Sequence, residues 1–235
     1  GNRVRFAAFG LEARLREINQ RGVFLARAAA GTDALLAGSL GPTGFKDIGA
    51  HAAEIGRAYG EQASTLADAG VDFLLLETMT SPEEARIAVD SLKKSTPLDV
   101  VCSFAFTRVT TGAFVTWSGA SIGEAVQMVR ESGVHMVGVN CVPANEDLHK
   151  MLASLHAAAP DVPLWLKPNA GSPHPQYGQP AYPSPVNGIS IPSDVLVDMN
   201  VAVIGGCCGT TPEHTKVLAD SVAAWHGMGK NLHRG

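Results

Sequence analysis

The sequence predicts an α/β fold made of repeated strand–helix units. Six short apolar runs, rich in β-branched residues, alternate with longer amphipathic stretches. The apolar runs are nearly continuous, as expected for parallel strands that are covered on both faces. The runs start at positions 34, 71, 99, 134, 163 and 201. Their mean spacing is about 33 residues, which is typical of a βα unit repeated without interruption.

Each predicted element follows from its local pattern. The expected strands are Ala34–Leu40, Val71–Leu76, Asp99–Phe106, Val134–Asn140, Pro163–Lys167 and Val201–Gly206. The expected helices, which show apolar residues at helical spacing, are Leu11–Ala30, Ile48–Ala69, Pro82–Leu92, Ile122–Glu131, Glu146–Ala159 and Pro212–Ala224. Ser81, Ser121 and Asn145 stand directly before three of these helices, where we expect them to act as N-caps.

Two architectures fit this repeat, a parallel barrel and a doubly wound open sheet. The glycines at 38, 41 and 44 do not have the spacing of a dinucleotide-binding fingerprint. A (β/α)8 barrel uses eight strands and roughly 250 residues. Here six strands are found, and the residues before position 34 supply only a helix. Both architectures stay open at this point, and a barrel would lack two of its βα units. We expect a single domain over residues 1–235.

The composition excludes several classes of protein. Of 235 residues, 46% are hydrophobic and only 17% are charged, which is enough apolar material for a substantial core. The net charge of −4 argues against a nucleic-acid surface. No apolar run reaches the roughly 20 residues of a membrane-spanning helix, so we expect no membrane contact. Four cysteines do not form a disulfide framework, and we expect a cytoplasmic chain with reduced thiols.

Polar and sulfur-bearing side chains follow the predicted strands at their C-terminal ends. Glu77 follows the second strand, Cys141 the fourth, Asn169 the fifth, and the adjacent Cys207 and Cys208 the sixth. In parallel α/β folds the loops after the strands converge at one edge, where binding sites are built. The sequence therefore predicts a site at this edge.

The cysteines at this edge indicate a metal site. Glycines flank Cys207 and Cys208 on both sides and allow the sharp turn that would let both thiols face one ion. With Cys141 they form a set of three thiolates, which suits zinc and leaves its fourth tetrahedral position open. The alternatives are small buried residues at crowded strand ends, or a thiol redox centre, against which the lack of a C-x-x-C motif counts. Cys102 lies inside an apolar run and is expected in the core.

The other candidate residues leave more than one interpretation. The Glu77 carboxylate needs a partner after an apolar strand: a substrate ammonium group, a salt bridge or a helix cap. Asn169 and Gly171 could donate hydrogen bonds to a carboxylate, or form a plain turn. His214 is expected to be a surface or packing residue. The proline-rich segment 172–192 is expected to form a lid or an extended wall.

Five motifs in order resemble the homocysteine S-methyltransferase family. This family includes betaine– and S-methylmethionine–homocysteine methyltransferases and the homocysteine-binding domain of cobalamin-dependent methionine synthase. The resemblance runs from about Gly1 to Trp225. Its motifs are Gly38-Ser39-Leu40-Gly41-Pro42-Thr43-Gly44, Leu76-Glu77-Thr78-Met79, Gly138-Val139-Asn140-Cys141, Pro168-Asn169-Ala170-Gly171 and Gly205-Gly206-Cys207-Cys208-Gly209-Thr210.

The resemblance implies a fold, a function and a set of site residues. The implied fold is a TIM-type (β/α)8 barrel, here N-terminally truncated to about six strands. The implied function is methyl transfer to the thiol of homocysteine, giving methionine, with zinc held by Cys141, Cys207 and Cys208 and no catalytic residue beyond the zinc site. Zinc would deprotonate a thiol whose pKa is otherwise near 8.5 and keep it nucleophilic. The resemblance also suggests that Glu77 holds the amino group of homocysteine. The predicted substrate contacts are Glu77, Ser39, Asn169 and Gly171.

The sequence departs from the family pattern at its start. Family members begin with a strand ending in an Asp-Gly-x-x-Gly-Thr type motif and a second unit ending in an Asn-Thr-Phe type motif, and this sequence has neither. An alternative function is therefore a homocysteine- or zinc-binding fragment without independent turnover. Such a fragment would act within a larger enzyme or an oligomer whose partner chain covers the open barrel edges. The predicted methyl donor is a methyl-corrinoid, with S-methylmethionine and betaine-type donors as alternatives.

Overall fold

The computed structural model of the chain describes residues 1–176, 179–182, 185–189, 191 and 193–232. Its main sheet has six parallel strands in chain order: β1 (Ala37–Leu40), β2 (Phe73–Met79), β3 (Val100–Phe104), β6 (Met136–Pro143), β7 (Leu164–Asn169) and β10 (Val201–Ile204). All six match predicted strands. A doubly wound sheet reverses its strand order at a switch point, whereas a barrel does not. The sequential order therefore identifies the barrel-type arrangement.

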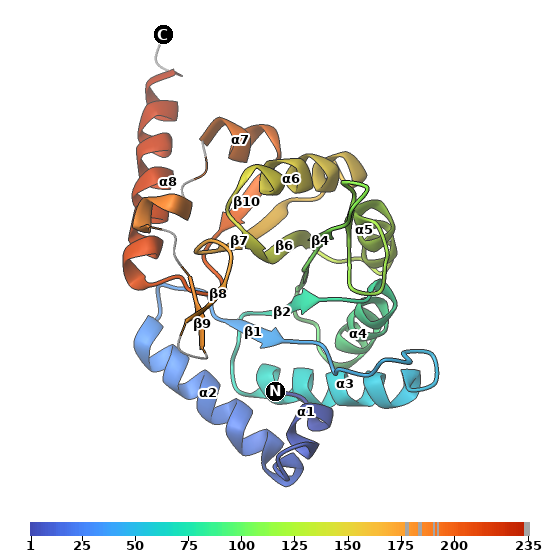
Figure 1. Cartoon of the computed structure of the whole chain (residues 1–235). Helices are drawn as coiled ribbons and strands as arrows, with labels where there is room; N and C mark the ends of the chain where they lie inside the picture. Colours follow the sequence, from blue (N-terminus) through green and yellow to red (C-terminus); the bar gives the residue numbers. More distant parts are fainter. Residues whose placement is uncertain (177–178, 183–184, 190, 192, 233–235) are drawn as a thin grey trace.

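The helices surround the outer face of the curved sheet (Figure 1). They are α1 (Arg3–Ala7), α2 (Leu15–Ala30), α3 (Ala52–Asp68), α4 (Pro82–Ser95), α5 (Ile122–Glu131), α6 (Glu146–Ala158), α7 (Ser193–Asp198) and α8 (Pro212–Leu232), with a 3-10 turn, η1 (Glu12–Arg14), before α2. The sequence did not predict α1 or α7, because helices of five and six residues are too short to show a periodic pattern. It also ended α8 too early, at position 224.

The predicted N-caps are confirmed and fix where three helices begin. The Ser81 hydroxyl accepts a hydrogen bond from the Glu84 amide at 3.3 Å. Ser121 and Glu124 form a reciprocal capping box at the start of α5. The Asn145 side chain accepts from the Asp147 amide at 3.0 Å. Helices α4 and α6 thus start three residues after the ends of β2 and β6, whereas the β4–β5 hairpin lies between β3 and α5.

Two small antiparallel hairpins lie outside the main sheet. The first pairs β4 (Thr107–Arg108) with β5 (Phe114–Val115), and the second pairs β8 (His174–Gln176) with β9 (Gln179–Ala181). A 3-10 turn, η2 (Val186–Ile189), follows the second hairpin. Residues 177–178, 183–184, 190 and 192 lie outside the described residues, so a lid or wall formed by segment 172–192 stays a prediction.

Side chains alternate between two apolar layers. Those facing outward pack under the helices, and Cys102 lies among them with no exposed surface, which confirms its expected place in the core. Those facing inward form an apolar floor inside the curved sheet: Ala37, Phe73, Leu75, Val101, Met136, Trp165 and Val203. The Phe73 and Trp165 rings meet edge to face with their centroids 6.0 Å apart. The interior of the barrel is therefore closed on this side by packed side chains.

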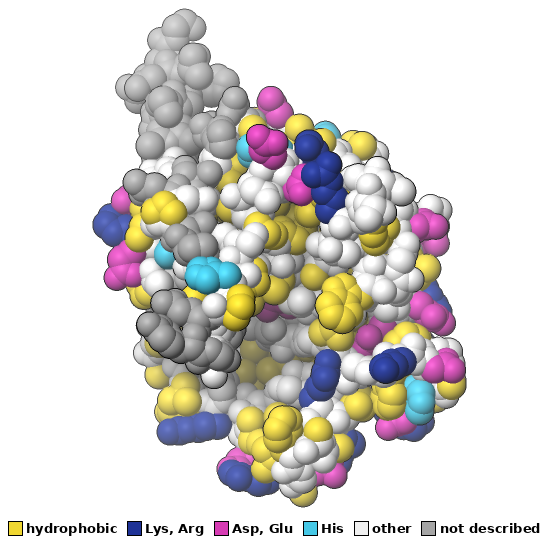
Figure 2. Space-filling view, in the orientation of Figure 1, with side chains coloured by type: hydrophobic (Ala, Val, Ile, Leu, Met, Phe, Trp, Pro, Cys, Tyr) yellow, Lys and Arg dark blue, Asp and Glu magenta, His cyan; other side chains and the backbone are white. Residues whose placement is uncertain are grey.

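The sheet has two open edges. Among the described residues, β1 pairs only with β2 and β10 only with β7. Large hydrophobic side chains are exposed near the β1 edge, including Phe9 and Leu35, each 77% exposed, and Phe24, 60% exposed. Figure 2 shows hydrophobic side chains gathered on the surface over α1 and the start of α2.

The single domain over residues 1–235 stays a prediction. No helix among the described residues has both the length and the apolar character needed to cross a membrane.

Candidate metal and substrate site

A polar layer lies directly above the apolar floor. Side chains alternate along a strand, so the residues two positions beyond the floor also point into the barrel. On four strands these positions are polar: Ser39, Glu77, Ser103 and Lys167. On β6 Gly138 takes this position, and Asn140, a further two positions along, lies directly beside Lys167 on the next strand. The predicted edge of the sheet thus carries an internal polar site.

Three thiols meet at this edge. The Cys141 and Cys208 sulfurs are 3.5 Å apart, and those of Cys207 and Cys208 are 4.0 Å apart. All three sulfurs lie within 4.8 Å of one another, the one cluster of potential metal-ligating groups found in the described part of the chain. A zinc–sulfur bond of about 2.3 Å in a tetrahedron places neighbouring sulfurs about 3.8 Å apart. The thiols therefore fit one zinc ion, with a fourth position left for another ligand.

The end of β7 holds the double-cysteine turn in place. The Cys207 amide donates to the Pro168 carbonyl at 2.8 Å, and the Cys208 amide donates to Asn169 Oδ1 at 3.0 Å. The Thr210 hydroxyl closes the turn by donating to the Cys207 carbonyl at 2.7 Å. These bonds fix both cysteines through their backbone, so the sulfurs are held independently of a metal.

Gly209 lets Tyr182 approach the thiols. Its φ of 77° lies in the left-handed region, and a Cβ at this position would come within 2.2 Å of Tyr182 Cγ. Hydrogen bonding with Cys208 raises the pKa of Tyr182 above its usual value. No sequence pattern predicts this contact, because Tyr182 lies in the irregular segment after β7.

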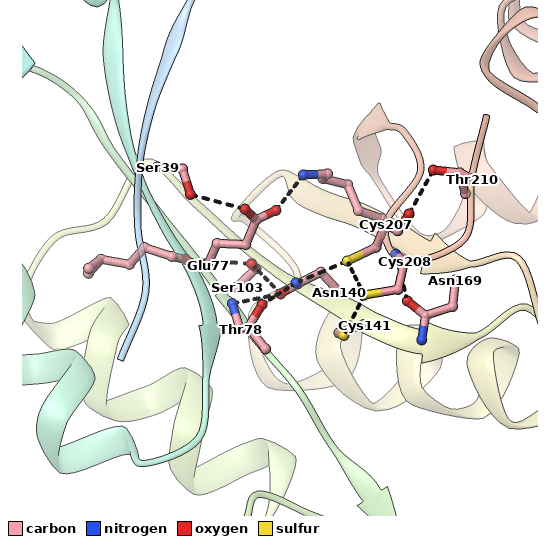
Figure 3. A network of polar contacts seen from close by, with 12 residues as sticks. Ser39, Glu77, Thr78, Ser103, Asn140, Cys141, Asn169, Cys207, Cys208 and Thr210 are labelled. Atoms are coloured by element: carbon pink, nitrogen blue, oxygen red, sulfur yellow. Dashed lines mark hydrogen bonds and ion pairs between the residues drawn. The ribbon is translucent and has the colours of Figure 1, made fainter. Parts of the chain in front are cut away.

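Asn140 connects the thiols to the polar layer (Figure 3). The side chain has no exposed surface and is engaged on both sides. Its oxygen accepts from the Thr78 amide at 2.9 Å and the Ser103 hydroxyl at 2.7 Å. Its nitrogen donates to the Thr78 hydroxyl at 2.7 Å and lies 3.7 Å from the Cys207 sulfur. Thr78 and Cys141 have φ of 59° and 60°, and this network contributes to holding that strained backbone.

The cysteines at this site differ in the pKa of their thiols. Interaction with the neighbouring Cys141 thiol, helped by the Asn140 amide, lowers the pKa of Cys207 to about 5. The same contact with Cys207 raises the pKa of Cys141 well above its ordinary value. This environment favours the thiolate form of Cys207, the form that binds metals. Burial raises the pKa of Cys102, which is inert by comparison.

The predicted substrate residues fall into two groups. Glu77 forms an ion pair with Lys167 and accepts a hydrogen bond from the Ser39 hydroxyl at 3.1 Å. The partner of Glu77 in the structure is thus a salt bridge, one of the three partners that the sequence left open. Asn169 supports the cysteine turn, and the Gly171 amide donates to the Asn169 carbonyl at 2.8 Å, both structural contacts. A substrate role for these four residues stays a prediction, and the sequence missed Lys167.

His214 was expected to be a surface or a packing residue, and the structure shows that it is a packing residue. Its side chain is 5% exposed. Its Nδ1 accepts a hydrogen bond from the Thr211 amide at 3.1 Å, at the start of α8. Its contacts lie behind the cysteine turn, and it does not belong to the thiol cluster.

Fold and site together define a TIM-type barrel protein with a three-thiol site that suits a metal ion. The chain belongs to the homocysteine S-methyltransferase family, whose family model matches residues 2–222. This confirms the resemblance inferred from the five motifs.

Several known proteins are similar to the chain. The methionine synthases of Mycobacterium leprae and Mycobacterium tuberculosis are 31% and 32% identical to it over 231 residues. The S-methylmethionine–homocysteine S-methyltransferase BHMT2 of Pongo abelii is 29% identical over 237 residues. The matches cover 92% and 93% of this chain, but 19% of each methionine synthase and 63% of BHMT2. The chain thus spans about a fifth of the length of the methionine synthases it matches.

Solved structures share the fold. The homocysteine methyltransferase MmuM from Escherichia coli, in its oxidized form, superposes with a TM-score of 0.69 at 25% identity, over 94% of this chain and 76% of that one. Its metallated form gives a TM-score of 0.69 at 24% identity, over 93% and 75%.

Proposed function

We propose that the chain transfers a methyl group to the thiol of homocysteine, giving methionine, with a zinc ion bound to Cys141, Cys207 and Cys208. The observation that carries this proposal is the meeting of three thiols at distances that suit zinc, a set that leaves one of the four tetrahedral positions of zinc for a further ligand. Family membership and the names of the relatives support homocysteine as the methyl acceptor.

The chemistry that zinc supplies is activation of the substrate thiol, because the metal favours the thiolate form at neutral pH and leaves it nucleophilic. The protein's own groups prepare the site. The surroundings of Cys207 favour its thiolate, and the Asn140 amide contacts its sulfur. Glu77 offers a carboxylate to the substrate ammonium group, and the apolar floor keeps water away from beneath the site. All four cysteines are free thiols, which suits the reducing cytoplasm that we propose as the location.

The methyl donor in this proposal is a methyl-corrinoid. Similarity to two methionine synthases supports it, and similarity to BHMT2 supports S-methylmethionine as the alternative, with betaine-type donors third. The chain would be supplied with methylcobalamin, S-methylmethionine or betaine together with homocysteine, and methionine would be measured by mass spectrometry. Methionine formed from S-methylmethionine but not from methylcobalamin would overturn the corrinoid assignment.

Zinc binding tests the proposed site directly. The purified chain is expected to hold about one zinc per chain and to bind homocysteine in a calorimetric titration. Cys207→Ala is expected to lose both the metal and the binding. Cys102→Ala is the matched control, because Cys102 lies in the core outside the site and its loss should leave the zinc content unchanged. Wild-type protein that holds no zinc after incubation with excess zinc would rule the proposal out.

A second candidate function is a homocysteine- or zinc-binding piece without independent turnover, which acts in a larger enzyme or an oligomer. The unpaired edges of β1 and β10 and the exposed Phe9, Phe24 and Leu35 favour it, since open parallel edges and apolar patches are sites of association. Sedimentation velocity combined with an activity assay on the same sample tests it. A monodisperse monomer that turns over homocysteine would remove this candidate.

A further inference from the structure

The ion pair between Glu77 and Lys167 crosses the interior of the barrel. Glu77 lies on β2 and Lys167 on β7, and two other strands separate these in the sheet. The two side chains are 19% and 22% exposed, so the pair is mostly desolvated yet reachable from solvent. A buried charge pair of this kind is a poor source of stability, because desolvation offsets much of the attraction. Stability alone therefore does not explain why this pair lies at the C-terminal edge of the barrel.

The pair borders the three thiols. Lys167 is the register partner of Asn140, whose amide contacts the Cys207 sulfur. On the other side, Glu77 directly precedes Thr78, which is bonded to the same Asn140 side chain. Figure 3 shows Glu77 and the cysteines as parts of one polar network. A ligand whose sulfur joins the thiols can therefore reach the ion pair with its other end.

Charge balance decides which ligand can open this pair. A simple amine would bind Glu77 and leave Lys167 without a partner, and a simple acid would do the reverse. Either outcome leaves a largely buried charge unpaired, which is strongly unfavourable. A zwitterionic α-amino acid supplies an ammonium for Glu77 and a carboxylate for Lys167, so that both charges stay paired.

We propose that Glu77 and Lys167 together bind the amino-acid end of the substrate, with Lys167 holding its α-carboxylate. This inference rests on the proposed function and adds Lys167 as a specificity-determining residue. Ser39 donates to the second oxygen of Glu77, so that carboxylate keeps its orientation when Lys167 turns to the substrate. The pair selects an amino-acid thiol over a thiol that lacks either charge.

Calorimetric titration of the zinc-loaded chain tests the inference. The three ligands are homocysteine, 3-aminopropanethiol, which lacks the carboxylate, and 4-mercaptobutanoate, which lacks the ammonium. Wild-type protein is expected to bind each truncated thiol about 10- to 100-fold more weakly than homocysteine, the usual effect of a lost charged hydrogen bond. Lys167→Met is expected to lose a similar factor for homocysteine but to bind 3-aminopropanethiol at least as tightly as wild type, because no lysine is left unpaired. Its preference for homocysteine therefore falls to near one or below.

Controls separate this effect from general damage. Lys216→Met removes an exposed lysine on α8 and is expected to change no affinity. Lys167→Gln serves as a second neutral variant if Lys167→Met fails to fold, and Lys167→Arg is expected to retain the preference for homocysteine. Zinc content and circular dichroism are measured on each variant.

Two results would overturn the inference. Lys167→Met protein that binds homocysteine as tightly as wild type, or more tightly, would mean that Lys167 only neutralises Glu77. An unchanged preference over 3-aminopropanethiol would exclude a carboxylate contact. Failure of the proposed function looks different, because the zinc-loaded wild-type chain would then bind none of the three thiols.

Discussion

Replacing Asn140 by alanine should weaken both the fold and the metal site. The change leaves the Thr78 amide, and the Ser103 hydroxyl beside it, without the oxygen that both donate to. A buried donor left without a partner costs about 1–3 kcal/mol, and hydroxyls that can turn to other acceptors cost less. The Ser103 hydroxyl has such an acceptor, the Leu76 carbonyl at 3.5 Å. We therefore expect a loss of about 2–4 kcal/mol in the free energy of unfolding.

Urea unfolding of the metal-free chain, followed by circular dichroism, measures this loss. With a denaturant slope of about 2 kcal/mol per M, the midpoint should fall by about 1–2 M. Zinc affinity should also fall, by about 10- to 100-fold, since the amide that contacts the Cys207 sulfur is gone. Asn145→Ala is the matched control: it removes an exposed N-cap, so it should cost about 1 kcal/mol and leave zinc binding intact. Equal losses of stability and unchanged zinc affinity in the two variants would refute the role given to Asn140.

Three further predictions concern the thiols and the glycines around them. In the metal-free chain, iodoacetamide at pH 6 should modify Cys207 and spare Cys102, because only the thiolate reacts and it forms at Cys207 above a pKa of about 5; peptide mapping that finds both equally modified would contradict this. Gly138→Ala places a Cβ 2.0 Å from a backbone oxygen of β7 and should cost about 3 kcal/mol or more in urea unfolding. Gly123→Ala on α5, which meets no atom within 4 Å, should instead be neutral or stabilise by up to about 1 kcal/mol. Gly209→Ala should lower zinc content, measured by atomic absorption, because the turn after the cysteines needs a positive φ; a full zinc complement would show that the turn adapts.

Much of the fold could be predicted because its signals are local. Continuous apolar runs marked all six strands of the sheet, and Ser81, Ser121 and Asn145 marked three helix starts. The choice between a barrel and a doubly wound sheet could not be made locally. It depends on which strands pair, such as β3 with β6 across the intervening hairpin and helix α5. Contacts of this kind are set by tertiary packing and leave no periodic trace in the sequence.

The site was predictable where chemistry requires a rare residue type. Adjacent cysteines between glycines predict a shared ligand site, and the structure brings both to Cys141. Lys167 was missed because a lysine at a strand end is common on protein surfaces, and its partner Glu77 lies 90 positions away. Tyr182 was missed for a similar reason, since only the close approach to Gly209 brings it to the thiols.

The central claim is that Cys141, Cys207 and Cys208 hold a zinc ion whose remaining position takes the homocysteine sulfur. X-ray absorption at the zinc edge, on the loaded chain before and after addition of homocysteine, tests it most directly. We predict three sulfur ligands at about 2.3 Å that become four when homocysteine binds. A sulfur count that does not change when homocysteine is bound would contradict the account.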